Sequence, residues 1–325
     1  MMSELFAVVL RANLVAAAAI LAVLILRLPA RRLFGPELAY GLWAAPPLAI
    51  FATLLPARSI EGAAGHALAE AVADISLPGL TLWALGVATT AAGLAWAQLR
   101  FLAQARAGRA GASVVGVISP RIVMPRDDGS YSDEERALIR AHEREHVARQ
   151  DPRARAVAAV LQALGWCNPL IHLGAHVMRL DQELACDAAV LRRRPRDRCL
   201  YARTLLKTQL ATQPLPFGCY WPARGAHPLE VRVALLKATR PHDSLTGVLL
   251  ISAAILTCAL TAWSVQPPVP RHPLPIHQLW DAQQGRHMSV MLITWPARED
   301  SRGELIRRDA IDRPPADARR APPAP

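Results

Sequence analysis

The sequence predicts a mainly α-helical membrane protein with four transmembrane helices and an α+β domain between the third and the fourth. Two observations predict this fold class. Four segments are apolar over about the 20 residues that a helix needs to cross a bilayer. The segment between the last two instead combines short β-branched runs with charged, amphipathic helical patterns.

The four apolar segments contain few charged residues. The first includes Arg11 near one end, where an arginine can extend towards the membrane interface. A cleaved signal peptide is the alternative for this segment, but Glu4 and the lack of a basic start favour an uncleaved anchor. The predicted spans are residues 5–26, 38–55, 80–97 and 245–265.

Basic residues in the short connections predict the orientation of the spans. The first connection contains Arg27, Arg31 and Arg32, whereas the second contains Arg58 among three acidic residues. Short cytoplasmic loops are enriched in lysine and arginine, so we expect the first connection in the cytoplasm. Residues 1–99 then form three membrane helices, 100–244 a cytoplasmic domain, 245–265 the fourth helix and 266–325 an extracytoplasmic tail. The predicted location is the cell (inner) membrane.

The net charge of +11 raises the question of nucleic-acid binding. The basic residues are spread through helical patterns, without a basic stripe interleaved with aromatic residues. Anionic lipids on the inner face of a membrane explain the excess more simply, so the expected partner is the lipid bilayer and not nucleic acid.

The five cysteines show no CxxC spacing. In the cytoplasm they would remain thiols. We expect them to be small, buried apolar residues.

The domain between the third and fourth spans is predicted to begin with a β-hairpin. Two β-branched runs, 114–118 and 122–124, flank Ser-Pro-Arg, and the adjacent prolines limit them to edge strands. A capping-box pattern at Ser132 and Glu135 then predicts a helix from Asp133 to about Gln150.

Further helices and a different kind of tail follow. Helices are expected at 154–164 and 169–179, with 181–192 continuing or restarting the second of them. The proline-rich residues 266–325 are expected to be mostly disordered, apart from a strand at 287–295.

The stretch AHEREHVARQD, residues 141–151, places His142 and His146 on one face of the first domain helix. Two imidazole nitrogens on one face can bind one metal ion, and Glu143 beside them can act as a general acid/base. A catalytic zinc site takes three protein ligands and leaves one position for water. The third ligand must come from elsewhere.

Glu183, on a later helix, is the preferred candidate for the third ligand. Glu145 shares a helix with the two histidines, but a rotation of about 100° per residue directs it away from their common face. It is expected to be solvated or ion-paired. His172 and His176 form another i, i+4 pair without an acidic residue between them, and packing or polar roles are favoured over metal binding.

Two aspartates are suited to support a ligand histidine. Asp187 follows Glu183 by about one helical turn and could accept a hydrogen bond from an imidazole, which fixes its tautomer. Asp151 could do the same, although a role in ending the first domain helix is equally open.

Four segments occur in a characteristic order and spacing: VVGVISPRIVMP, HEREHVARQD, WCNPLIHLGAHVMRLDQELACDAAVL and HPLEVRVALL. In this order and spacing they resemble the BlaR/MecR-type antirepressor membrane metallopeptidases. The resemblance covers roughly residues 5–265 and implies a gluzincin-like Zn²⁺ peptidase domain between the third and fourth spans. It implies His142, His146 and Glu183 as zinc ligands, Glu143 as the catalytic acid/base and Asp187 as the supporting aspartate of an ExxxD pattern.

The chain departs from this family pattern after the fourth span. Some members have an extracellular penicillin-binding sensor, which needs a serine and a lysine in an SxxK motif. The residues after Val265 contain no lysine, so β-lactam acylation is not expected as the signal. Three functions remain: a signalling endopeptidase that cleaves a cytoplasmic protein such as a DNA-binding repressor, a quality-control protease, and a non-proteolytic signal relay.

Overall fold

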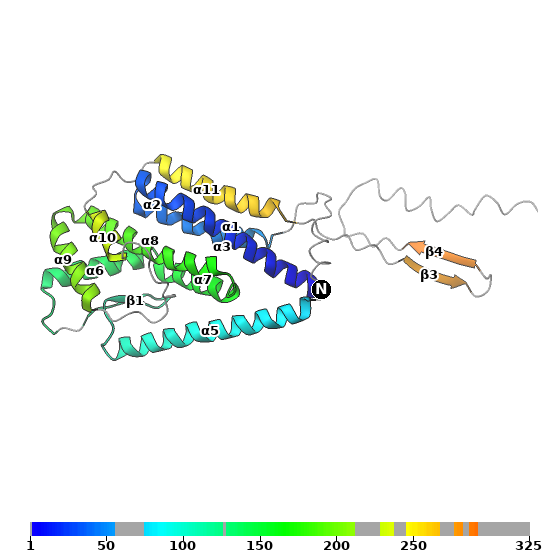
Figure 1. The fold of residues 1–325 in the computed structure, drawn as a ribbon, viewed down its shortest axis with the longest axis horizontal. Coiled ribbons are helices and arrows are strands. Elements are labelled where there is room, and N and C mark those ends of the chain that lie inside the picture. Colours follow the sequence, from blue (N-terminus) through cyan, green and yellow to red (C-terminus); the bar gives the residue numbers. More distant parts are fainter. Residues whose placement is uncertain are drawn as a thin grey trace, which may run out of the picture. The chain divides into compact units, whose positions relative to one another are not determined.

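The chain forms two compact units, residues 1–269 and 270–325. A computed structural model describes residues 2–55, 75–125, 128–211, 228–236, 245–266, 276–281 and 286–291. The described part of the larger unit is almost entirely helical and includes one short hairpin (Figure 1).

Three helices are long and apolar enough to cross a membrane among the residues described. They are α1 (Met2–Phe34), α5 (Ser76–Arg106) and α11 (Leu245–Ser264), which contain or match the first, third and fourth predicted spans. The predicted class of membrane protein is therefore supported by the structure.

The second predicted span, 38–55, is helical in three successive pieces. These pieces are α2 (Pro36–Tyr40), the 3₁₀-helix η1 (Gly41–Ala44) and α3 (Ala45–Ala52). Pro46 and Pro47 lack the amide hydrogen that would bond back to the preceding turn, which explains the change of helix type before them. Four spans therefore remain a proposal.

The hairpin and the capped helix of the central segment are confirmed. Strands β1 (Ser113–Val115) and β2 (Arg121–Val123) pair antiparallel. Helix α6 (Asp133–Ala148) begins with the expected reciprocal bonds between Ser132 and Glu135. It ends slightly earlier than expected, because Gln150 adopts a left-handed conformation with φ 58° that redirects the chain.

The following helices are longer than the patterns suggested. Helix α7 (Asp151–Leu164) begins three residues before the predicted start, with a proline in its first turn. Helix α8 (Pro169–Arg193) is one continuous helix of 25 residues, so 181–192 continues it without interruption. The elements that complete this part are η2 (Pro195–Asp197), α9 (Arg198–Ala211) and α10 (Pro228–Leu236).

The smaller unit contains a hairpin of β3 (Ile276–Asp281) and β4 (Arg286–Met291), with Ile276 opposite Met291. The predicted strand at 287–295 overlaps β4, whereas β3 was not predicted. The remaining tail residues lie outside the described part.

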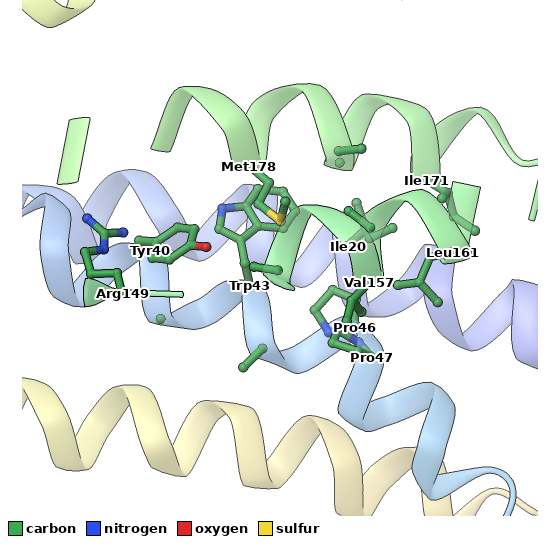
Figure 2. Close-up of a pocket in the computed structure, with 16 residues that line it drawn as sticks. Ile20, Tyr40, Trp43, Pro46, Pro47, Arg149, Val157, Leu161, Ile171 and Met178 are labelled. Carbon is green, nitrogen blue, oxygen red and sulfur yellow. The ribbon is translucent and has the colours of Figure 1, made fainter. Parts of the chain in front are cut away.

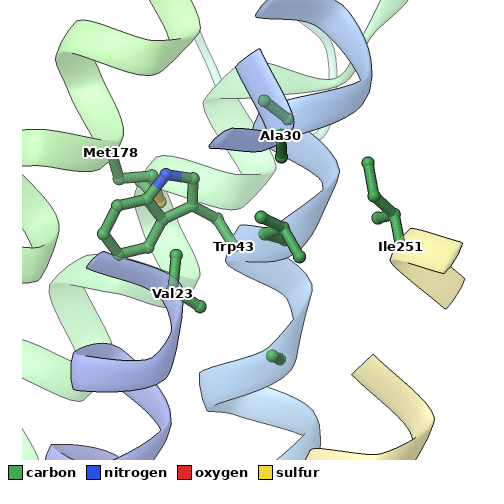
Figure 3. Packing of buried hydrophobic residues seen from close by; sticks show 8 residues of the cluster. Val23, Ala30, Trp43, Met178 and Ile251 are labelled. Carbon is green, nitrogen blue, oxygen red and sulfur yellow. The ribbon is translucent and has the colours of Figure 1, made fainter. Parts of the chain in front are cut away.

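Two hydrophobic clusters meet on α8 and fix its position. In the first, Trp43, Val23 and Met178 join η1, α1 and α8, with Ile251 of α11 at the edge (Figure 3). In the second, Val190 and Leu191 of α8 pack with residues of α6, α9 and α10, namely Leu138, Tyr201, Leu205 and Leu236. Helix α8 therefore connects the membrane helices to the histidine-bearing helix.

The expectation that the cysteines are buried is correct only in part. Cys186 of α8 is fully buried and Cys258 is partly buried, but Cys167 and Cys199 are exposed. The reason is position, because Cys167 lies in the turn before α8 and Cys199 on the outer side of α9. All four are free thiols. Cys219 lies outside the described residues.

Candidate metal centre

Helices α6 and α8 bring together the three residues proposed from the sequence as metal ligands. The Nε2 atoms of His142 and His146 are 3.2 Å apart. One oxygen of Glu183 lies 3.3 Å from His142 Nε2, and the other lies 3.5 Å from His146 Nε2. Zinc bonded tetrahedrally at about 2.0–2.1 Å requires its ligand atoms to be about 3.3 Å apart. The three side chains therefore fit a zinc ion.

The other nitrogen of each imidazole has a partner that sets its tautomer. His146 Nδ1 lies 2.7 Å from a carboxylate oxygen of Asp151, to which it can donate a hydrogen bond. His142 Nδ1 lies 2.8 Å from the hydroxyl of Tyr201, and that hydroxyl donates to Asp187 at 2.6 Å. Because the Tyr201 hydroxyl donates its hydrogen to Asp187, the hydroxyl oxygen accepts a hydrogen bond from His142 Nδ1. Both Nε2 atoms are then left with a free lone pair, as metal binding requires.

The two aspartates considered from the sequence thus reach different histidines. Asp151 is at the start of α7 and contacts His146 directly. Asp187 is 3.4 Å from His142 Nδ1, and the shorter route between them runs through Tyr201. Asp187 therefore positions His142 mainly through the tyrosine.

Arg232 of α10 is a buried cation at this site that the sequence reasoning did not single out. It donates two hydrogen bonds to Asp187, each 2.8 Å long, and its third nitrogen lies 3.1 Å from Glu183. Arg155 of α7 lies 3.3 Å from the other oxygen of Glu183. Arg232 occurs in the segment HPLEVRVALL, but Tyr201 lies in no motif and no spacing pattern would have identified it.

The electrostatic environment favours a charged Glu183. Burial alone would raise the pKa of Glu183, but Arg232 and the two histidines outweigh that effect and hold the pKa well below its usual range. Burial lowers the pKa of His142, but the hydrogen bond and negative charge of Glu183 outweigh it, so the net direction is upward.

Glu143 is directed into the protein and is 7% exposed. Burial is the main cause of its raised pKa, and the neighbouring histidines oppose the effect. Such a carboxyl group is more basic than one in water.

Glu145 was predicted to be solvated or ion-paired. It forms the predicted ion pair, with Arg193 of α8, but its side chain is buried and not solvated. The alternative pair of histidines shows polar roles, because His172 Nε2 lies 2.9 Å from the carbonyl oxygen of Trp166. His176 is exposed.

A second group of possible ligands, among the residues described, consists of His146, Asp151 and Cys186. The sulfur of Cys186 lies 3.3 Å from His146 Nδ1, the same nitrogen that bonds to Asp151. Burial raises the pKa of the Cys186 thiol, which disfavours the thiolate that would bind a metal. The group that contains Glu183 is therefore the better metal site.

An apolar cavity of about 320 Å³ lies between α1, the α2–α3 segment, α7 and α8. Figure 2 shows Ile20, Val157 and Leu161 towards one end of it and Tyr40 and Arg149 towards the other. The guanidinium of Arg149 stacks 4.5 Å from the centre of the Tyr40 ring. None of the three candidate ligands lines this cavity, so it is distinct from the metal site.

The fold and the site together define a class of protein. A mainly helical chain with apolar helices able to span a membrane, and with an HExxH helix facing a carboxylate, has the features of a membrane metallopeptidase. The chain belongs to the BlaR1 peptidase M56 family, whose sequence model matches residues 7–84 and 110–236. The resemblance drawn from the four segments is confirmed.

The chain is also similar to a curated protein, Regulatory protein BlaR1 of Bacillus licheniformis. It is 32% identical over 77 residues, which is 24% of this chain and 13% of that protein. No solved structure matches the chain significantly. Membership of the family, together with the apolar helices, indicates a membrane-associated peptidase.

Proposed function

We propose that the chain is an integral membrane zinc endopeptidase that cleaves a cytoplasmic protein during signal transduction. His142, His146 and Glu183 would hold Zn²⁺, and Glu143 would be the catalytic acid/base. The observation that supports this best is the convergence of three side chains: the two imidazole Nε2 atoms are 3.2 Å apart, and each lies 3.3 or 3.5 Å from one of the two oxygens of Glu183.

The residues around the site have complementary roles in peptide hydrolysis. A bound zinc ion would supply a Lewis acid that lowers the pKa of a water molecule and polarises the scissile carbonyl group. Glu143 takes a proton from the attacking water and returns it to the departing amine. Asp151 and Tyr201 orient the imidazoles, and Arg232 neutralises the negative charge that Glu183 and Asp187 place in a buried site.

The proposed substrate is a cytoplasmic protein of the class of DNA-binding repressors, by analogy with the antirepressor family. Two findings support this proposal: the chain belongs to a peptidase family, and the relative from Bacillus licheniformis bears the name of a regulatory protein. The proposed topology has four spans, with residues 100–244 in the cytoplasm and 266–325 outside, and the +11 charge suits anionic lipids on the inner face.

The Glu143→Gln variant tests the mechanism. Glutamine keeps the size of the side chain but cannot accept the proton, so we expect about one zinc ion per chain to be retained and proteolysis to be lost, by about 100-fold or more. Glu134→Gln is a matched control, because Glu134 is an exposed residue in the first turn of the same helix. Full activity in Glu143→Gln would refute the assigned role.

A comparison of proteomes with and without Glu143→Gln distinguishes the proposed substrate class from the alternatives. Loss of cleavage of a single cytoplasmic regulator supports signalling. Accumulation of many misfolded membrane proteins would instead indicate quality control, and intact signalling by the inactive variant would indicate a relay that needs zinc only for its fold.

A further inference from the structure

Helix α7, the turn after it and the first half of α8 contain a long stretch without ionisable acids or bases other than histidine. Residues 156–178 include no aspartate, glutamate, lysine or arginine. Charged residues begin immediately outside this stretch, with Arg155 on one side and Arg179 on the other. Helices that face water usually bear charged residues on their outer side. This stretch therefore differs from a helical hairpin of a water-soluble domain.

The turn of this hairpin lies against two candidate membrane spans, beside Asn13 of α1 and beside Trp83 in the first third of α5. The side chain of Asn168 donates to the carbonyl oxygen of Asn13 in α1 at 3.0 Å. Trp83 of α5 donates to the carbonyl of Leu164 at 2.8 Å, and Trp166 donates to the carbonyl of Trp83 at 3.2 Å. Figure 1 shows α7 and α8 between α1 and α5, in agreement with their contacts.

A glycine in α5 makes this close approach possible. Gly86 faces the indole of Trp166, and a Cβ atom added at Gly86 would lie 2.0 Å from the ring. Any side chain there would push the turn away from α5. The turn is therefore packed into the body of α5.

The depth of the turn follows from helix lengths. Asp181 of α8 pairs with Arg27 at 2.9 Å, which marks the charged end of α1. From this pair, the chain runs 14 residues along α1 to Asn13 and 13 residues along α8 to Asn168, or about 20 Å at about 1.5 Å per residue. The hydrocarbon core of a bilayer is about 30 Å thick. If α1 spans the membrane, the turn lies well inside that core.

The surface of the hairpin suits lipid. The large side chains that it exposes include Val157, Val160, Leu164 and Leu173, all apolar. Polar groups at the turn are bonded internally: His172 contacts a carbonyl, and the Asn168 side chain accepts from the amide of Leu170 at 3.1 Å. The exposed His176 lies five residues before Asp181, towards the charged end of the hairpin. Internal bonding of polar groups is what a hydrocarbon environment demands.

We propose that residues 151–181 form a re-entrant hairpin, which enters the bilayer beside the metal site, turns within the hydrocarbon core and leaves on the same side. This hairpin is the exception to the cytoplasmic location proposed for residues 100–244. Its outer face is covered by lipid acyl chains. Asp151 begins the hairpin and Glu183 follows its last residue by two positions, so the metal site lies at the membrane surface. This topology holds whether or not the site is proteolytic, and its tests do not measure proteolysis.

Two native cysteines provide a matched pair for the first test. Cys167 lies in the turn of the hairpin and Cys199 lies on α9, and both are exposed in the absence of lipid. Sealed membrane vesicles of each orientation would be treated with a membrane-impermeant maleimide, and each cysteine would be quantified by mass spectrometry. We expect Cys199 to react in one orientation and Cys167 to react in neither until the membrane is dissolved.

Two results of this labelling would overturn the proposal. Reaction of Cys167 at the rate and in the orientation of Cys199 would place the hairpin in water. Reaction of Cys167 only in the opposite orientation would show that the hairpin crosses the membrane, so that its arms are two further spans.

The second test identifies what covers the hairpin. The triple variant Cys199→Ser, Cys219→Ser, Cys258→Ser keeps Cys167 and the fully buried Cys186, and a fluorophore is attached to Cys167 before reconstitution. We expect nitroxides on lipid acyl chains to quench the label more strongly than headgroup nitroxides or aqueous iodide. A matched variant labelled at Cys199 should respond mainly to iodide.

Folding of both variants is checked by retention of the wild-type helix content. Protection of Cys167 from maleimide without quenching by acyl-chain nitroxides would mean that a protein surface, such as a second copy of the chain, covers the hairpin. That result would refute lipid as the partner.

Discussion

Replacement of Tyr201 by phenylalanine tests the support of His142 with little change of shape. The hydroxyl is 2.8 Å from His142 Nδ1 and donates to Asp187 at 2.6 Å. Phenylalanine keeps the aromatic ring, which is buried among residues of α6, α8 and α10. The change should therefore appear in metal affinity more than in packing.

The magnitude follows from the neighbours of the hydroxyl. Loss of a group that supports a ligand histidine weakens metal binding by about 10- to 100-fold, or roughly 1.4–2.8 kcal/mol. Asp187 lies 3.4 Å from His142 Nδ1 and is held in place by Arg232, so a small shift lets its carboxylate accept the imidazole hydrogen directly. We therefore expect zinc affinity to fall by about 10-fold, at the lower end of this range.

The assay is a competition titration of the full-length protein in detergent against a chromophoric zinc chelator of known affinity. Tyr131→Phe is the control, because Tyr131 lies just before α6 and its ring contacts Lys207 at 4.9 Å, far along the helix from the histidines. A zinc affinity of Tyr201→Phe within about twofold of wild type would refute the tautomer argument. An equal loss in the control would show a general effect on folding.

Three further substitutions test other contacts of the site. Asp151→Asn removes the charge that supports the second histidine, and we expect zinc affinity to fall about 10-fold in the same titration. Arg232→Met leaves Asp187 buried without its cation, which should destabilise the metal-free protein by about 3–5 kcal/mol; an unchanged Tm would contradict this. Asp181→Asn weakens the ion pair with Arg27, and we expect the free energy of zinc binding to become less favourable by about 0.5–2 kcal/mol. Zinc titration curves identical to those of the wild type would show that this ion pair does not influence the metal site.

The part of the site that could be predicted from the sequence depends on local geometry. His142 and His146 are four residues apart, so the helix alone places them together. Glu183 could be chosen because the acidic rival on the same helix points away from them. Tyr201 and Arg232 approach the site only through the packing of α9 and α10, which follows no sequence period.

A membrane helix could be predicted from the sequence where one apolar segment forms one continuous helix. Helices α1, α5 and α11 meet this condition. The 38–55 segment does not, because Pro46 and Pro47 interrupt the regular bonding of the helix. Residues 156–178 escaped notice as a membrane segment because they are split between two helices, and neither apolar part reaches the length of a span.

The continuity of α8 has a mechanical consequence. Asp181, fastened to Arg27 and to the indole of Trp43, is only two residues from Glu183 on a helix without a break. A helix of this kind turns and slides as a rod, so the carboxylate cannot shift independently of the anchor next to it. Any rearrangement of the amino-terminal helix that tilts this rod would also change the distance between Glu183 and the two imidazoles.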